Sequence, residues 1–444
     1  MITRVITYIE NFGITGSGFL SFIFFILILW AESLRPETIA DTIQVFVTLA
    51  PIWIPIALGA WGWHVWVEYI RARTISKMEN VLLEIKLPRE IEKTPLAMET
   101  IFSTLHRRPG ESTFIKRYIN GNVRPWWSFE IVSIEGEIHF FIWTRKDFRR
   151  LIEADIYAQY PNIEIFEASD YTRSPNVNPK FMWGLDYTLD REDAYPIRTY
   201  IDYGLHETQP KEEQKVDPFV SVLEFLGSLG KGEQLWFQIM IRVNRDSKWI
   251  EKKHKKGTVF GKIGWQEEAK NLINDLMKRD PKTLGSSQFS PSGFPIFTTL
   301  SPGEQEELKA IERSVTKLGY DCGMRAIYMA DQPNFNASCI YSLIYFFKPF
   351  WSNKLNRFVG TRWGMKYDYP WQDFKDMRWD RDRRRLLDAY KRRSYFHEPY
   401  KTLHFVMNTE ELATIYHFPG QVAQTPTLGK IQSTKAEAPP NLPV

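Results

Sequence analysis

The sequence is poor in cysteine, with only Cys322 and Cys339 among its 444 residues. Two thiols cannot form the set of disulfides that stabilises a small secreted domain, and they cannot supply four sulfur ligands to zinc. They are typical of a protein kept in a reducing compartment. The 8 histidines are scattered, without an HExxH motif or a Cys/His cluster, so the sequence predicts neither a metal site nor a cofactor.

Motifs of the common catalytic sites are missing as well. The two stretches nearest to a phosphate-binding loop, 227–232 and 257–263, end in Gly and Ile where that loop needs a Ser or Thr hydroxyl for magnesium. The spacing Ser314-x-x-Lys317 occurs without the companion motifs of penicillin-binding enzymes, and nothing singles out two carboxylates as an acid–base pair. The sequence therefore predicts a protein that is not an enzyme.

A strong charge bias is also lacking, because 57 Lys and Arg residues face 53 Asp and Glu residues, for a net charge of +4. This balance does not identify a nucleic-acid-binding protein unless the basic residues gather in one place. Apolar residues are abundant: 43% of the chain is hydrophobic and 15% is aromatic. This composition excludes a mainly disordered chain, and the length predicts two or more globular units.

Two uncharged apolar stretches lie near the N-terminus, at 11–31 and 42–67. Each is long enough to cross the hydrocarbon core of a membrane, which takes about 20 residues of helix. They predict a hairpin of two transmembrane helices within residues 1–75, with spans at 12–31 and 43–67. Neither span contains a charged residue, so the hairpin is expected to anchor the protein rather than to form a transport path.

Flanking charges predict the orientation of this hairpin. Arg71, Arg73 and Lys77 follow the second span, whereas the loop between the spans holds one arginine and three acidic residues. Lys and Arg residues of short loops stay on the cytoplasmic side, so both termini and the bulk of the chain are expected in the cytoplasm. Trp61 and Trp66 fall where the second span would meet the headgroups.

Residues 80–170 have the pattern of an α+β domain. Strands and amphipathic helices follow one another in the order βαββαβ, with a hairpin turn at Glu135-Gly136. This order predicts a ferredoxin-like domain. The expected elements are a strand at 81–87, a helix starting at Pro95 after Thr94, hairpin strands at 127–132 and 137–143, a helix after Asp147 and a strand at 162–167.

A second series of elements occupies residues 180–350. We interpret it as another α+β domain of ferredoxin-like type, interrupted by a basic insertion at 245–303. The elements expected in it are helices from Asp217 and at 304–318, and strands at 235–243 and 324–329. Beyond it, the sequence predicts a basic and aromatic helical segment at 351–419 and an extended tail at 420–444.

Basic residues gather in two places. The insertion is rich in lysine, and ten Lys or Arg residues between Lys375 and Lys401 accompany five acidic residues and several aromatics. Basic residues interleaved with aromatics can bind single-stranded nucleic acid, through phosphate contacts and base stacking. Basic residues near a membrane anchor can bind anionic lipid. The third interpretation is a solvated helix face or a contact with protein. These three interpretations stay open. The candidate contacts are Lys252, Lys253, Lys255, Lys256, Arg383, Arg384, Arg385, Arg392 and Arg393.

The C-terminal part carries a run of residues with a family likeness. The run is Asn408-Thr409-Glu410-Glu411-Leu412-Ala413-Thr414-Ile415-Tyr416-His417-Phe418-Pro419, preceded by residues 392–400. It resembles the segment before the nucleotide-binding domain in membrane-anchored coupling ATPases of bacterial type IV secretion and conjugation. Residues 83–95 and the hairpin at 129–141 are similar to the membrane-proximal domain of the same proteins, so the likeness extends over most of the chain.

The resemblance implies a component of a bacterial machine that transfers DNA or protein. The sequence ends where the Walker motifs of that family would begin. The expectation is therefore a non-enzymatic anchor and adaptor in the inner membrane, which works with a separately encoded ATPase and can assemble as a homo-oligomer. The alternative is a membrane-tethered protein that binds single-stranded nucleic acid.

The same run contains the residues expected to dock the ATPase. Asn408 can cap a short helix, and the apolar side chains behind it can serve as interface anchors. Packing of the run against its own domain is the alternative. The candidate docking residues are Asn408, Glu411, Leu412, Ile415, Tyr416 and Phe418.

Overall fold

The structure is a computed structural model, and the residues it describes are 44–45, 47–88, 93–107, 113–173, 181–206, 217–245, 264–277, 300–363 and 371–419. They form two compact units. The helical unit contains the described residues up to 77, residues 113–123 and residues 371–381, and the sheet unit contains the others. The predicted span at 12–31, Lys252, Lys253, Lys255, Lys256 and the tail at 420–444 lie outside the described residues.

The helical unit is built on α4 (Ala50–Ser76), which has a proline in its first turn. The short helix α6 (Phe114–Tyr118) starts after Thr113, whose hydroxyl accepts a hydrogen bond from the Lys116 amide. None of the helices in the described ranges combines the length and the hydropathy that a membrane span requires. The predicted span at 43–67 is therefore not confirmed, because Trp, Gly, Pro and His interrupt the aliphatic residues of α4.

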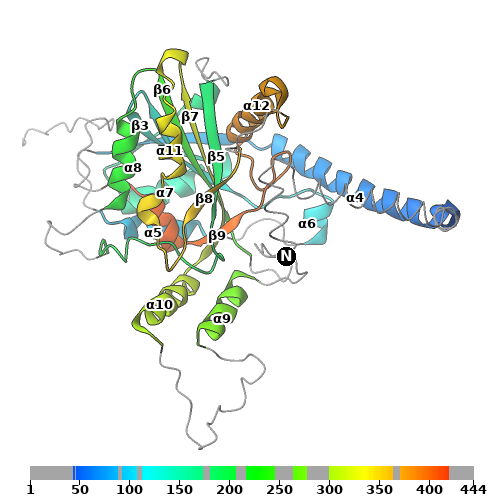
Figure 1. Ribbon diagram of the computed structural model, residues 1–444, viewed down its shortest axis with the longest axis horizontal. Coiled ribbons are helices and arrows are strands. Elements are labelled where there is room, and N and C mark those ends of the chain that lie inside the picture. Colours follow the sequence, from blue (N-terminus) through cyan, green and yellow to red (C-terminus); the bar gives the residue numbers. More distant parts are fainter. Residues whose placement is uncertain are drawn as a thin grey trace, which may run out of the picture. The chain divides into compact units, whose positions relative to one another are not determined.

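Nine strands form a single sheet in the sheet unit, and every strand pair is antiparallel (Figure 1). Eight strands follow the order β4-β1-β3-β2-β6-β7-β5-β8, and the ninth, β9, pairs with the start of β7. The strands are β1 (Asn80–Lys86), β2 (Trp127–Ile134), β3 (Glu137–Arg145), β4 (Glu164–Glu167), β5 (Met182–Leu189), β6 (Glu233–Val243), β7 (Gly319–Ala330), β8 (Phe358–Arg362) and β9 (Phe405–Asn408).

The strand order is mirrored about the centre of the sheet. Strands β4, β1, β3 and β2 lead to the centre from one edge, and β8, β5, β7 and β6 lead to it in the corresponding order from the other. The halves join where β2 pairs with β6, from Trp127 opposite Ile241 to Ile134 opposite Gln234. The two α+β domains that the sequence suggests, at 80–170 and 180–350, thus share one sheet and are linked by main-chain hydrogen bonds.

Several helices cover one face of the sheet, whereas the end of α12 lies against the other face, where Gln238 of β6 donates a hydrogen bond to the Tyr390 carbonyl. Phe102 of α5 meets Phe129 of β2 with ring centroids 5.1 Å apart, and Phe237 of β6 meets Phe346 beyond α11 at 5.6 Å. In Figure 1, α9 and α10 lie side by side, and their buried side chains pack together. The helices are α5 (Pro95–Leu105), α7 (Arg149–Gln159), α8 (Pro218–Gly227), α9 (Trp265–Leu276), α10 (Pro302–Thr316), α11 (Ser338–Ile344), α12 (Met377–Lys391) and α13 (Thr409–Ile415).

The prediction of an α+β fold is confirmed. The expected strands and helices of 80–170 are present, and so are those expected between 217 and 329, with bounds that differ by a few residues. Asp217 caps α8, since its carboxylate accepts a hydrogen bond from the Phe219 amide at 2.9 Å. Strands β5, β8 and β9 are not among the expected elements, and β8 and β9 are short.

Candidate functional site

The run expected to dock an ATPase lies inside the sheet unit. It begins at the last residue of β9 and continues through α13, and its six candidate side chains are at most 1% exposed. Tyr416 packs edge-on against Phe129 and Phe140, with ring centroids 5.1 and 6.0 Å apart. Phe418 packs against Phe140 at 5.6 Å and Tyr160 at 5.1 Å. An external partner would have to extract these side chains from the core. Their burial favours the alternative interpretation, in which the run packs against its own domain.

Polar residues of the run tie it to neighbouring segments. Asn408 and Glu411 form a reciprocal cap at the start of α13, and Glu411 also accepts a hydrogen bond from the Ile197 amide at 2.9 Å. Glu410 pairs with Arg313 of α10 at 3.2 Å. Burial raises the pKa of Glu411 to about 8, against the opposing effect of the Asn408 and Ile197 amides. Internal contacts therefore account for several of the polar residues that make this run recognisable.

His417 ends the run in a buried pair with Asp217. Its Nδ1 lies 2.9 Å from the Ala413 carbonyl oxygen and its Nε2 lies 3.0 Å from Asp217 Oδ2. Burial raises the pKa of Asp217, but the paired imidazole and the Phe219 amide more than reverse this, so the net shift is downward. The pair links α8 to α13.

Buried charges separate the sheet from residues 382–404, which cover its second face. Glu130 of β2 is fully buried, and side chains that alternate along a strand place it opposite to Phe129. Its two carboxylate oxygens face Arg393 Nε at 3.0 Å and Nη2 at 3.1 Å. Further hydrogen bonds reach it from Ser128, Tyr171 and Gln238. These donors explain how a carboxylate can lie in the core, where an unpaired one would be costly.

Arg393 is held at both ends of its guanidinium. Nη1 donates to Asp170 Oδ2 at 2.7 Å and to the Lys391 carbonyl at 3.1 Å. Burial would lower the pKa of Arg393, but Glu130 and Asp170 raise it well above its ordinary value. Its φ of 48° lies in the left-handed region, which costs an L-residue about 1–2 kcal/mol. Arg393 was a candidate contact for nucleic acid or lipid, and this buried pairing removes it from that role.

Two more arginine–carboxylate pairs lie on the same face of the sheet. Arg325 of β7 donates to Asp186 of β5 at 2.7 Å, and neither side chain is more than 2% exposed. Arg242 of β6 donates to Asp321 of β7 at 2.7 Å, and burial of Asp321 is outweighed by its cationic neighbours, so its pKa is lowered. We call the three pairs the ion-pair layer: Glu130, Asp186, Asp321, Arg242, Arg325 and Arg393.

Aromatic rings from residues 382–404 pack against the arginines of the ion-pair layer. The ring of Phe396 lies 4.4 Å from the Arg242 guanidinium carbon, and that of Tyr395 lies 5.8 Å from the Arg325 carbon. A Cβ on Gly323 would fall 2.4 Å from the Tyr395 ring, so only glycine fits there without a shift. The charges of the ion-pair layer are paired with one another. The layer can therefore hold residues 382–404 against the sheet.

The other basic candidates on α12 and after it lie nearer the surface. Arg384 and Arg385 are exposed, and Arg383 is half-buried. Arg392 is exposed but pairs with Asp388 one turn earlier, at 2.8 Å. The structure therefore does not gather the basic candidates of this segment into one surface, because Arg393 is directed into the core and Arg392 toward its own helix.

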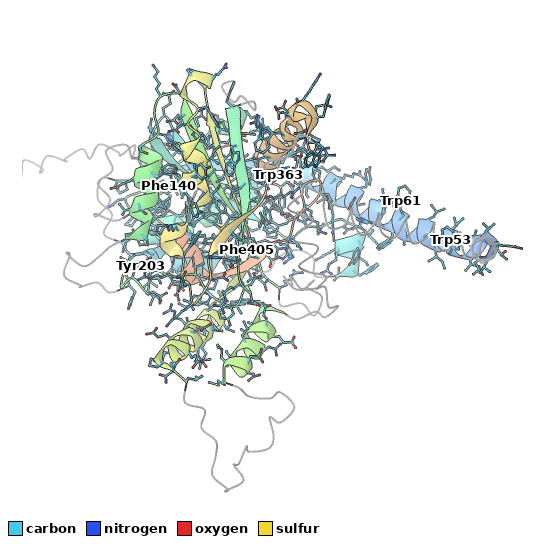
Figure 2. All side chains as sticks on the ribbon, viewed as in Figure 1. Trp53, Trp61, Phe140, Tyr203, Trp363 and Phe405 are labelled. Atoms are coloured by element: carbon cyan, nitrogen blue, oxygen red, sulfur yellow. The ribbon has the colours of Figure 1, made fainter. Side chains whose placement is uncertain are left out.

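The helical unit carries most of the exposed apolar surface in the described part of the chain. Exposed large apolar side chains number 13 at 45–69, 3 at 114–119 and 3 at 371–377, against 7 in the sheet unit. On α4, Ile52 is 63% exposed, Ile56 is 68% and Trp61 is 67%. Trp53 and Trp61 project from this helix (Figure 2). An apolar patch of this size is typical of a surface that contacts a membrane or another protein.

Sequence reasoning missed the ion-pair layer, although one signal was present. Glu130 is the single charged residue in the strand Trp127–Ile134, a position at which a charge has to be paired if both faces are covered. Its partner Arg393 is 263 positions away, so no local pattern could identify it.

An α+β protein with a nine-stranded antiparallel sheet and a separate apolar helical unit is the class that these observations define. The family model described as a domain of unknown function, DUF8128, matches residues 71–430. The chain therefore belongs to the DUF8128 family. No curated protein and no solved structure matches it.

Proposed function

We propose that the chain is a non-enzymatic, membrane-attached adaptor of a bacterial type IV secretion or conjugation machine, and that it works with a separately encoded ATPase. In this proposal the helical unit, together with the predicted span at 12–31, attaches the protein to the inner membrane. The sheet unit lies on the cytoplasmic side and presents the surface that the partner binds.

The exposed apolar surface of the helical unit is the observation that carries this proposal. In α4 the side chains of Ile52, Trp53, Ile54 and Ile56 are all exposed, so apolar groups point from every side of the helix. Arg71 and Arg73 follow, where cations would meet anionic headgroups. A helix with this distribution is favoured in a lipid environment over water.

The order of the strands defines the domain to which the recognisable run belongs. We infer that each half of the sheet is a ferredoxin-like unit, since β1 to β4 have the order 4-1-3-2 and the second half mirrors it. The recognisable run at 408–419 belongs to this domain through internal contacts. In this proposal the chain resembles coupling ATPases because both contain this domain. Partner binding is assigned to exposed residues rather than to Tyr416 and Phe418.

Recovery of the partner tests the adaptor role. The tagged full chain is crosslinked in its native membranes, extracted in mild detergent and analysed by mass spectrometry. We expect an ATPase with Walker motifs among the retained proteins. Recovery of no such ATPase, from protein that is well extracted and crosslinked, would remove the secretion role.

A matched pair of variants tests the membrane role. Changing Ile52, Ile56 and Leu58 to Gln should lower the fraction that stays in carbonate-washed membranes, because all three are exposed on α4. The control changes Leu96, Tyr341 and Tyr345 to Gln, which are also exposed but belong to the sheet unit, and should have no effect. Equal retention of both variants would count against membrane attachment through α4.

A further inference from the structure

Helix α6 is packed against α4 within the helical unit. Trp63 of α4 stacks on Phe114 with ring centroids 6.2 Å apart and contacts Tyr118 at 5.8 Å. Trp66 Nε1 donates a hydrogen bond to the Tyr118 carbonyl at 3.2 Å. Gly121, with φ of 65°, ends the connection, and a Cβ there would lie 2.6 Å from the Ile70 carbonyl oxygen. These contacts fix α6 beside Trp63, Trp66 and Ile70 of α4.

The outer surface of α6 is apolar despite this packing. Phe114 is 62% exposed, Ile115 is 58% and Ile119 is 54%. Three large apolar side chains within six residues leave the helix with a surface that water solvates poorly. Lys116 is exposed between them, so the same short helix also presents a cation.

The charged side chains that α4 and α6 themselves carry are almost all positive. Arg71, Arg73 and Lys77 end α4, and Lys116 and Arg117 lie on α6. The described residues at 44–77 and 113–123 contain a single acidic residue, Glu68, which pairs with His64 at 3.1 Å. Exposed aromatic and aliphatic groups with a border of cations complement the boundary between acyl chains and anionic headgroups.

We propose that α6 is a second membrane contact of this protein, lying in the headgroup–acyl boundary of an anionic lipid surface beside α4. Phe114, Ile115 and Ile119 enter the boundary, and Lys116 and Arg117 face the phosphates. A protein groove would cover one stripe of a helix, whereas apolar side chains leave α4 in all directions, which suits lipid. This inference rests on the proposed membrane attachment.

Site-specific fluorescence on the full chain tests the inference. Ile115→Cys, Ile56→Cys and Lys231→Cys are labelled in turn with an environment-sensitive dye and reconstituted into phosphatidylcholine vesicles that contain phosphatidylglycerol. The native Cys322 and Cys339 are buried, and the unsubstituted chain measures their background. Lys231 is exposed in the sheet unit and serves as the matched control. Iodide probes access from water, and a lipid-borne quencher probes contact with the bilayer.

We expect the dyes at 56 and 115 to be several-fold less accessible to iodide than the dye at 231, and to be quenched from the lipid. If 56 is shielded while 115 is as accessible as 231, the inference about α6 is wrong and membrane attachment stands. If neither is shielded, both fail. Shielding of 115 without quenching from the lipid would show that protein covers it, which also overturns the inference.

The lipid charge is tested separately. Replacing both Lys116 and Arg117 with Gln should weaken quenching at 115 in the anionic vesicles, since each cation near such a surface favours association about fivefold. Equal quenching in vesicles of phosphatidylcholine alone would overturn the assignment of an anionic surface.

Discussion

Removing Arg393 should destabilise the sheet unit more than removing its neighbour Arg392, although both are arginines paired with carboxylates. Arg393 is 2% exposed and donates to Glu130, Asp170 and a main-chain carbonyl. Breaking a buried pair by removing one partner costs about 3–5 kcal/mol. Glu130 keeps three other donors, Ser128, Tyr171 and Gln238, which places the expected loss for Arg393→Met near the lower end, at about 3 kcal/mol.

Arg392→Met is the matched control. Arg392 pairs with Asp388 on the surface, and such pairs contribute about 0–1 kcal/mol. The assay is the denaturant midpoint of the full chain in a fixed mild detergent, followed by tryptophan fluorescence. One of the 16 tryptophans, Trp143, lies beside the pair, with its ring 5.9 Å from the Arg393 guanidinium carbon.

A double variant separates charge from packing. Adding Glu130→Gln to Arg393→Met removes the uncompensated carboxylate charge and should restore part of the loss, with a coupling of about 1–3 kcal/mol. The reasoning would be refuted if Arg393→Met shifted stability no more than Arg392→Met. It would also be refuted if the double variant were less stable than the two single effects added together.

Three further outcomes follow from the geometry. Tyr416→Ala should cost about 3–5 kcal/mol of unfolding free energy, whereas Tyr157→Ala, at a side chain 42% exposed, should cost about 0.5 kcal/mol; equal thermal shifts would contradict the buried placement of the 408–419 run. Because burial raises the folded pKa of Glu411 to about 8, above its unfolded value, stability should fall as pH rises from about 5 to about 8, and Glu411→Gln should flatten this slope in pH-dependent melting. Gly323→Ala should force the Tyr395 ring off β7 and expose 392–404 to protease; unchanged digestion would show that the segment adjusts without cost.

The sequence by itself determined the local elements of this protein. Alternating apolar residues predicted the hairpin of β2 and β3, helical spacing predicted α10, and proline after a capping residue predicted the starts of α5 and α8. These features depend on residues a few positions apart, so a single chain reveals them. The class of fold follows from their order.

Contacts between distant residues were decided only by the tertiary structure. The pairing of β2 with β6 merges two expected domains into one sheet. The residues of each strand do not identify the other strand as its partner. Arg393 lies in a basic run that suggests a surface, yet its φ of 48° and its bonds to Glu130 and Asp170 hold it in the core. Tyr416 and Phe418 would suit an interface or a core equally well by type, and only the rings packed around them decide which.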